Sequence, residues 1–117
     1  MKNHLNISLI IPYYNEKNEV LRTIRKILNQ DHVPKEIILV NSSSNDESCQ
    51  IVDNFIKTLK IKYVRIKNIS KGTKFPSTSK NLGIKNSKYK LVSFIDCGLK
   101  LKKNWLYNQY NLLKKKK

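Results

Sequence analysis

The stretch Ser8-Leu-Ile-Ile-Pro12, followed at once by Tyr13-Tyr-Asn-Glu16, decides how this chain is expected to fold. Leu5 to Ile11 is a short apolar run with β-branched residues, which is typical of a buried strand. Pro12 cannot donate a hydrogen bond to a strand ladder, so we expect the strand to stop there. The sequence therefore predicts a buried first strand that delivers a polar loop, Tyr13 to Glu16, to one edge of a sheet.

Apolar runs of strand length alternate with apolar residues at helical spacing along the rest of the chain. The pattern predicts further strands over 36–40, 63–66 and 91–95, and helices over 20–28, 77–84 and 105–113. A further helix is expected after Ser44, with an apolar face formed by Val52, Phe55, Ile56 and Leu59. Ser44 and Glu47 have the spacing of a capping box, so we expect Ser44 to cap the second helix. This alternation predicts right-handed βαβ units, and hence an α/β fold with a mostly parallel sheet flanked by helices.

Polar clusters follow three of the predicted strands. They are Tyr13 to Glu16, Asn41 to Asp46, and Asp96 to Gly98. Ligands of open α/β sheets bind at the carboxyl ends of the strands. We therefore expect the three clusters to converge on one ligand site.

The length of 117 residues indicates one domain, which we place at residues 1–113, followed by a lysine-rich tail at 114–117. Cys49 and Cys97 lack the pair spacing of zinc or redox motifs, so we expect both to be reduced and mostly buried. A net charge of +16 favours nucleotides, nucleic acid or an anionic membrane as partners. The alternative is that a Lys/Asn-rich bias merely produces solvated surfaces.

No segment approaches the ~20 consecutive apolar residues of a membrane span. The first five residues lack the apolar stretch of a secretion signal. We therefore expect a cytoplasmic protein, and the positive charge makes the inner face of a membrane a second expected location.

Five ordered motifs resemble those of the family 2 glycosyltransferases. They are Ser8 to Glu16, Leu28-Asn-Gln30 with Pro34, Ile37 to Asp46, Lys80-Asn-Leu-Gly83, and Phe94 to Gly98 with Trp105-Leu106. The resemblance covers nearly the whole chain. It implies the GT-A (Rossmann-like) fold, incomplete relative to full-length members, and binding of a nucleotide-diphosphate sugar.

The resemblance also implies roles for individual residues. Tyr14 would stack on a uracil ring, since an aromatic face offers stacking, and Lys80 would neutralise phosphate. Asp96 corresponds to the first carboxylate of the family's metal motif, which implies Mg²⁺ or Mn²⁺. The implied nucleotide contacts are Pro12, Tyr14, Glu16, Asn41, Ser43 and Lys80, and the implied metal contact is Asp96.

Two of these motifs depart from the family pattern. Asn41 stands where relatives usually have an Asp that accepts a hydrogen bond from the base; an amide still offers an acceptor and gains donors. Gly98 stands where relatives have the second metal-binding carboxylate. Metal binding is therefore expected to depend more on the phosphates of the substrate.

Each candidate also has a structural interpretation that the sequence leaves open. Tyr14 would then be a rim aromatic, Lys80 a solvated side chain, and Asp96 a cap for the loop after its strand. Asn41 and the serines after it are residue types that commonly form turn and cap hydrogen bonds. Gly72 and Gly83 are too isolated to form a phosphate-binding glycine loop.

The segment after Asp96 lacks a candidate general base, because residues 97–117 contain no Asp or Glu. Inverting members of the family use a downstream carboxylate to deprotonate the acceptor hydroxyl. The leading hypothesis is therefore the donor-binding half of a hexosyltransferase, which binds a UDP-sugar but lacks the catalytic base and the acceptor half.

The alternative is a catalytically inactive basic module that docks on an anionic membrane or an acidic protein. Nucleic-acid binding is less favoured, because no nucleic-acid-binding motif accompanies the charge.

Overall fold

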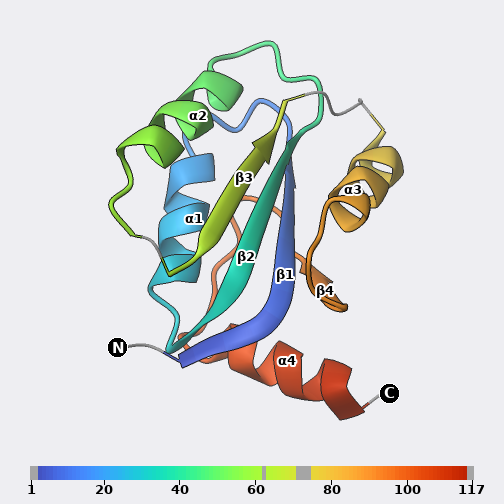
Figure 1. Ribbon diagram of the computed structural model, residues 1–117. Helices are drawn as coiled ribbons and strands as arrows, with labels where there is room; N and C mark the ends of the chain where they lie inside the picture. The colour runs from blue at the N-terminus through green and yellow to red at the C-terminus, as the bar shows by residue number, and fades with distance from the viewer. Residues whose placement is uncertain (1–2, 62, 71–74, 116–117) are drawn as a thin grey trace.

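The structure, a computed structural model, describes residues 3–61, 63–70 and 75–115. Within those residues, strands and helices alternate along the chain, and Figure 1 shows helices on both faces of one sheet. The elements are β1 (Asn3–Tyr13), α1 (Val20–Leu28), β2 (His32–Asn41), α2 (Ser48–Thr58), β3 (Arg65–Ile69), α3 (Pro76–Lys85), β4 (Leu91–Phe94) and α4 (Trp105–Lys115).

The sheet has the order β3-β2-β1-β4, and every neighbouring pair is parallel. The predicted α/β class and parallel sheet are therefore confirmed. In the register of the central pair, Tyr13 lies opposite Asn41. Because all strands run the same way, the loops after β1, β2 and β4 leave from one edge of the sheet.

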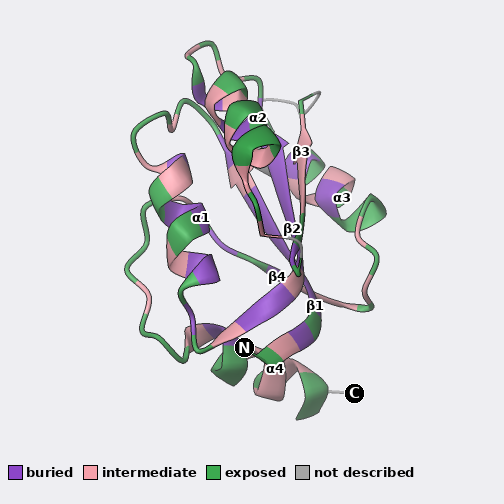
Figure 2. Ribbon diagram, turned by 60° about the vertical axis from the view of Figure 1, so that its left-hand side comes forward, coloured by how far each residue is buried: buried purple, intermediate pink, exposed green. Residues whose placement is uncertain are grey.

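The larger core lies on the face of the sheet that α1, α2 and α4 cover. Strand residues such as Leu9 and Ile37 are fully buried there, together with Ile24 of α1, Val52 of α2 and Leu106 of α4. Figure 2 shows the same pattern, with buried residues along the strands and on the inner sides of the helices. The continuous apolar runs of β1 and β2 are thus explained by burial on both faces of the sheet.

The opposite face carries a smaller apolar cluster, Ile10, Ile38 and Val40, and α3 packs beside it through Leu82. The close approach of α3 to β1 depends on Gly83, because a Cβ atom there would lie 2.6 Å from Cγ2 of the fully buried Ile10. Gly83 therefore serves helix-to-sheet packing. Gly72 lies outside the described residues.

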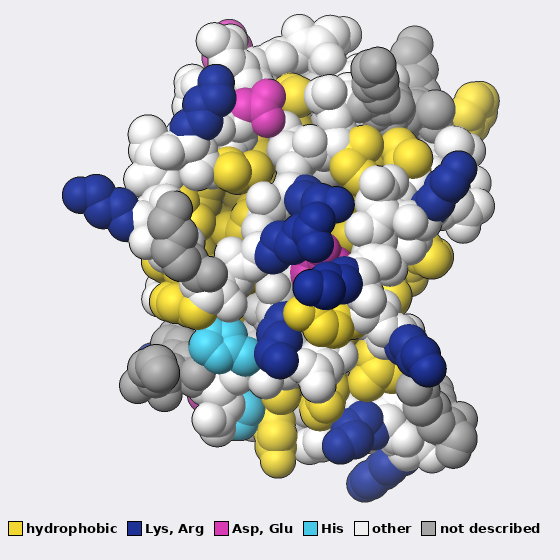
Figure 3. All heavy atoms as spheres, viewed as in Figure 1, with side chains coloured by type: hydrophobic (Ala, Val, Ile, Leu, Met, Phe, Trp, Pro, Cys, Tyr) yellow, Lys and Arg dark blue, Asp and Glu magenta, His cyan; other side chains and the backbone are white. Residues whose placement is uncertain are grey.

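The same face buries one carboxylate, that of Glu36 on β2. Its Oε1 accepts hydrogen bonds from Ser8 Oγ (2.8 Å) and from the backbone N–H of Lys88 (2.8 Å), while Arg65 Nε lies 3.6 Å from Oε2. Figure 3 shows several Lys and Arg side chains gathered near the middle of the molecule in that view. Glu36 thus ties β2 to β1, β3 and the loop before β4.

Several element boundaries differ from the sequence predictions; among them, the second strand begins at His32 rather than at Glu36. The first strand continues through Pro12 to Tyr13, where Tyr13 O still accepts a hydrogen bond from Ser42 N at 2.8 Å. By alternation along the strand, the missing N–H of Pro12 faces the β4 side, beyond the end of that strand at Phe94. The ladder therefore loses no bond at Pro12.

The second helix and third strand also begin later than predicted. Glu47 is the N-cap of α2 and makes no side-chain cap bond, so the predicted capping role of Ser44 is wrong. Ser44 Oγ instead accepts a hydrogen bond from Asn15 N. The third strand runs over Arg65–Ile69 rather than 63–66. Val64 belongs to the loop before this strand, and its side chain is buried.

None of the described helices has the length and apolar character needed to cross a membrane. The last helix, α4, extends to Lys115 and so includes the first two residues of the lysine run. Residues 116 and 117 of the predicted tail lie outside the described residues.

The packing at Gly83 yields a testable prediction. Gly83→Ala is expected to destabilise the fold by roughly 1–3 kcal/mol, because Ile10 must move from its buried position to admit the methyl group. Asn81→Ala on the exposed side of the same helix is the control and should be neutral or slightly stabilising. Urea unfolding measures both; a Gly83→Ala protein as stable as the parent would refute the packing role.

Candidate functional site at the carboxyl edge of the sheet

The loops after β1 and β2 are joined by direct hydrogen bonds. Asn15 N donates to Ser44 Oγ at 2.9 Å, and Asn15 Oδ1 accepts from Asn45 N at 2.8 Å and from Asp46 N at 3.3 Å. Glu16 N donates to Ser48 Oγ at 2.8 Å, which connects the first loop to the start of α2. The predicted convergence of these two loops is therefore present.

Both loops depend on left-handed backbone conformations. Asn15 has φ of 50° and Ser43 has φ of 62°. Asn adopts this region more readily than most residues, whereas for Ser the conformation carries strain on the order of 1 kcal/mol. Such strain is maintained by the surrounding hydrogen bonds and is common in ligand-binding loops.

The third loop, after β4, is fixed by α1. The N–H of Gly98 donates to Thr23 Oγ1 at 3.1 Å, and that hydroxyl donates to Glu19 O at 2.9 Å. Gly98 has φ of +86°, a conformation that L side chains rarely adopt. The backbone conformation of this loop therefore favours glycine at position 98.

Acidic side chains from all three loops influence one another. Burial is the largest cause that raises the pKa of Glu16, and the negative charges of Glu19, Asp46 and Asp96 raise it further. For Asp46, desolvation opposes ionisation, but hydrogen bonds from the Ser48 hydroxyl and N–H lower the pKa overall. The carboxyl edge is therefore a locally acidic region on a basic protein, and a cation there would relieve the repulsion at Glu16.

The two tyrosines of the first loop have different environments. Tyr13 is buried, and its hydroxyl donates to Asn68 Oδ1 at 2.8 Å. Burial raises the pKa of that phenol above its ordinary value, so Tyr13 stays protonated. Tyr14 is 49% exposed at the rim of the site. Of these two tyrosines, Tyr14 therefore has the solvent-exposed ring.

Asn41 and the residues after it form a hydrogen-bonded turn. Asn41 is buried, and its Oδ1 accepts a hydrogen bond from Ser44 N at 2.9 Å. This is the turn hydrogen bond expected if Asn41 has a structural role. Ser42 Oγ donates to Ser79 Oγ of α3 at 2.8 Å. One acceptor position of Asn41 is thus occupied within the protein, while its amide nitrogen carries the remaining donors.

The remaining candidates also lie near this edge. Lys80 of α3 places its Nζ 5.5 Å from the ring centre of Phe94, the last residue of β4. Pro12 is partly buried and pairs with Val40, one residue before Asn41. Pro12 therefore shapes the backbone of the first loop rather than presenting a polar group.

Asp96 is exposed and, within the described residues, makes no hydrogen bond or ion pair. The described part of the chain holds no group of three or more His, Cys, Asp and Glu residues placed to bind a metal ion. Asp96 can therefore supply one hard oxygen ligand, and further ligands would have to come from a bound molecule or water.

Cys97 lies between Asp96 and Gly98 but is not a candidate nucleophile. Burial, followed by the charge of Glu16, raises the pKa of the Cys97 thiol to about 12. The thiol is thus protonated at neutral pH, and thiolate chemistry is disfavoured. Both cysteines are free and half-buried.

Several residues that organise the site were not singled out from the sequence. Asn15 bridges two loops, Thr23 holds the third loop, and Ser48 anchors Glu16. An Asn directly after a strand is a usable signal, because Asn tolerates the left-handed region. The hydroxyls of Thr23 and Ser48 act across long sequence separations, which local patterns do not encode.

The bridging role of Asn15 can be tested with two variants. Asn15→Ala removes the Oδ1 bonds and disfavours the positive φ, so we expect a loss of about 1–3 kcal/mol. Asn15→Gly keeps the conformation and should cost less, about 0.5–1.5 kcal/mol, because only the hydrogen bonds are lost. Denaturant unfolding measures both. Equal stability of parent and both variants would contradict the role assigned to Asn15.

Solved structures match this chain and its fold. S. aureus TarS in complex with UDP-GlcNAc superposes with a TM-score of 0.70 at 23% identity, over 98% of this chain and 32% of TarS. The mannosyltransferase PcManGT from Pyrobaculum calidifontis, in complex with GDP-Man and Mn²⁺, gives a TM-score of 0.68 at 20% identity. The match covers 78% of this chain and 27% of PcManGT. These likenesses confirm the GT-A fold in partial form.

Sequence comparison adds the family. An uncharacterized glycosyltransferase from Rickettsia bellii is 34% identical over 90 residues, which are 77% of this chain and 12% of that protein. This chain therefore spans only a small part of the curated relative. The profile of glycosyl transferase family 2 matches residues 8–117. On that match, the chain belongs to glycosyl transferase family 2.

Proposed function

We propose that this domain binds a nucleotide-diphosphate sugar, with UDP as the nucleotide, at the carboxyl edge of its sheet. The observation that carries the proposal is the convergence of three loops there, with an exposed aromatic ring at Tyr14 and an unpaired carboxylate at Asp96. Support also comes from the structural neighbours, which include TarS with UDP-GlcNAc and PcManGT with GDP-Man.

The base would lie against Tyr14, since an aromatic face stacks on any base. Asn41 lies one strand away, opposite Tyr13 in the sheet register. Because its Oδ1 already accepts from Ser44 N, Asn41 would act chiefly through its amide N–H donors toward a carbonyl of uracil. Glu16 of the loop after β1 and Ser43 of the loop after β2 would contact the ribose.

The diphosphate would lie toward Lys80 and Asp96. The ammonium of Lys80 supplies a compact positive charge for phosphate oxygens. A divalent cation, Mg²⁺ or Mn²⁺, would neutralise the departing diphosphate when bound. Since Asp96 offers a single carboxylate, we expect metal and nucleotide to bind together and the metal alone to bind weakly.

Transfer of the hexosyl group needs a base for the acceptor hydroxyl. Residues 97–117 supply no carboxylate, so we propose that this chain by itself binds the donor without transferring the sugar. Glu16 is not placed in that role. We assign Glu16 instead to the ribose.

The alternative, an inactive basic module docked on an anionic membrane at the cytoplasmic face, stays a prediction. The net charge of +16 supports it. It differs from nucleotide binding in one measurable respect, because attachment would fall with salt and ignore added nucleotide.

Calorimetric titration with UDP and a UDP-sugar, with and without Mn²⁺, tests the proposal. We expect saturable binding that Mn²⁺ strengthens. Tyr14→Ala should weaken it by roughly 5- to 150-fold, since stacking of one base is worth about 1–3 kcal/mol. Asp96→Asn should abolish the Mn²⁺ enhancement and leave the metal-free affinity unchanged.

Tyr63→Ala is a matched control, because Tyr63 is 48% exposed, packs edge-on against His4, and lies before the start of β3. Its affinity for UDP should equal that of the parent. The proposal fails if UDP does not bind with Mn²⁺ present, or if Tyr14→Ala and Tyr63→Ala have the same effect.

A further inference from the structure

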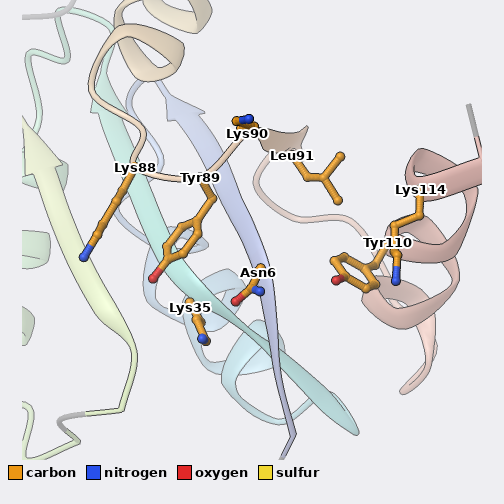
Figure 4. Close-up of a pocket in the computed structure, with 8 residues that line it drawn as sticks. All are labelled: Asn6, Lys35, Lys88, Tyr89, Lys90, Leu91, Tyr110 and Lys114. Carbon is orange, nitrogen blue, oxygen red and sulfur yellow. The ribbon is translucent and has the colours of Figure 1, made fainter. Parts of the chain in front are cut away.

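A second opening lies toward the amino ends of the strands, away from the carboxyl-edge loops. Its volume is about 650 Å³, within the roughly 300–1,000 Å³ of small-ligand pockets. It is formed between the start of β4 and α4, as Figure 4 shows. The residues that line it are Asn6, Lys35, Lys88, Tyr89, Lys90, Leu91, Tyr110 and Lys114.

The fold holds the floor of this cavity in place. The register of β1 against β2 shifts between Leu5 and Ser8, and Asn6 is the exposed residue of that irregularity. Bulges of this kind redirect a side chain out of the regular pattern. The loop before β4 is also anchored, because Tyr89 N donates to Ser8 Oγ at 3.2 Å and Lys88 N donates to Glu36 Oε1 at 2.8 Å.

The cavity collects uncompensated positive charge. Among the described residues, Lys35, Lys88, Lys90 and Lys114 form no ion pair with a carboxylate. Lys114 Nζ lies 5.2 Å from the ring centre of Tyr110, which holds that ammonium beside the opening. The carboxylate under the loop, Glu36, is fully buried and has Arg65 as its ion-pair partner.

We propose that this cavity binds a compact anion that carries two or more phosphate groups. Lysine acts on phosphate as a point charge and needs no planar fork, so four ammonium groups suit tetrahedral groups with several charged oxygens. The hydroxyls of Tyr89 and Tyr110 and the amide of Asn6 add neutral hydrogen-bond donors. A single carboxylate would leave most of these charges unmatched.

This anion site is separate from the proposed nucleotide site. None of its lining residues comes from the three carboxyl-edge loops. The lysines, the bulge and the cavity therefore support anion binding here whether or not UDP binds at the carboxyl edge. The same chemistry is offered by a free oligophosphate and by a polyphosphoinositide headgroup in a membrane.

The first test is titration of the chain with inorganic tripolyphosphate in EDTA, which removes metal-dependent binding at Asp96. We expect saturable binding that weakens as salt rises. The triple variant Lys35→Gln, Lys88→Gln and Lys114→Gln should lose roughly 10- to 150-fold in affinity, from about 0.5–1 kcal/mol for each ammonium.

The control removes the same charge elsewhere, with Lys57→Gln, Lys60→Gln and Lys103→Gln at exposed positions outside the cavity. Its affinity should stay within about threefold of the parent, because only the diffuse field changes. Equal losses in the two triple variants, or no binding by the parent, would overturn the proposal. Thermal melting of each variant checks that the fold is retained.

Lysine footprinting locates the anion independently of the variants. Acetylation of Lys35, Lys88, Lys90 and Lys114 should slow when tripolyphosphate is present, and saturating UDP should not reverse this. Protection at Lys80 that UDP displaces would instead place the anion at the nucleotide site and refute a separate cavity.

Vesicles distinguish the two sources of the anion. Binding to vesicles with phosphatidylinositol bisphosphate that the cavity triple variant loses would support the headgroup source. Binding of tripolyphosphate without such vesicle binding would support a free anion. Equal binding to phosphatidylserine vesicles of the same charge, unaffected by the cavity variant, would mean diffuse attraction and contradict the proposed site.

Discussion

The parallel pairing of β1 with both β2 and β4 is the constraint on which the rest of the structure depends. It places Tyr13 opposite Asn41 on one side, and on the other it aligns Ile10 with Phe94, two residues before Asp96. Backbone bonds extend the pairing past the strands, from Ser42 N to Tyr13 O and from Ile95 N to Ile10 O. Three loops distant in sequence therefore leave the sheet side by side.

The loops then fix one another. Asn15 links the first two through its backbone and side chain, and Thr23 of α1 holds the third at Gly98. The positive φ of Ser43 carries backbone strain, and the raised pKa of Glu16 means that the fold disfavours its ionised form. Such costs concentrated at one edge are what a preorganised binding site requires, since the ligand meets groups already in place.

The periodicity of the sequence predicted the order and type of all described elements, because burial on one or both faces leaves a direct pattern in apolar residues. The capping box at Ser44 was wrong for a physical reason: its hydroxyl is engaged by Asn15, 29 residues away, and α2 begins after it. The third strand was misplaced because Val64 is buried as a loop residue. A local sequence pattern cannot predict contacts between residues that are far apart in the sequence.

For the site, the strand-end rule predicted which loops meet, and the resemblance supplied the residue roles. The sequence could not tell whether Asn41 bonds within its turn or to a ligand; the structure shows the bond to Ser44 N. Gly98 was read as a lost carboxylate, and its φ of +86° adds a conformational reason for glycine there. The sequence did not indicate the cavity near α4, because its residues come from β1, β2, the loop before β4, the start of β4, and α4.

Nucleotide binding where the three loops converge can be followed residue by residue. Amide resonances of the ¹⁵N-labelled chain are recorded during titration with UDP and Mg²⁺. We expect saturable shifts at Tyr14 to Glu16, at Asn41 to Ser44 and at Asp96 to Gly98. Shifts confined to the cavity near α4, around Asn6, Tyr89 and Leu91, or no saturable shifts at all, would show that the nucleotide does not bind at this edge.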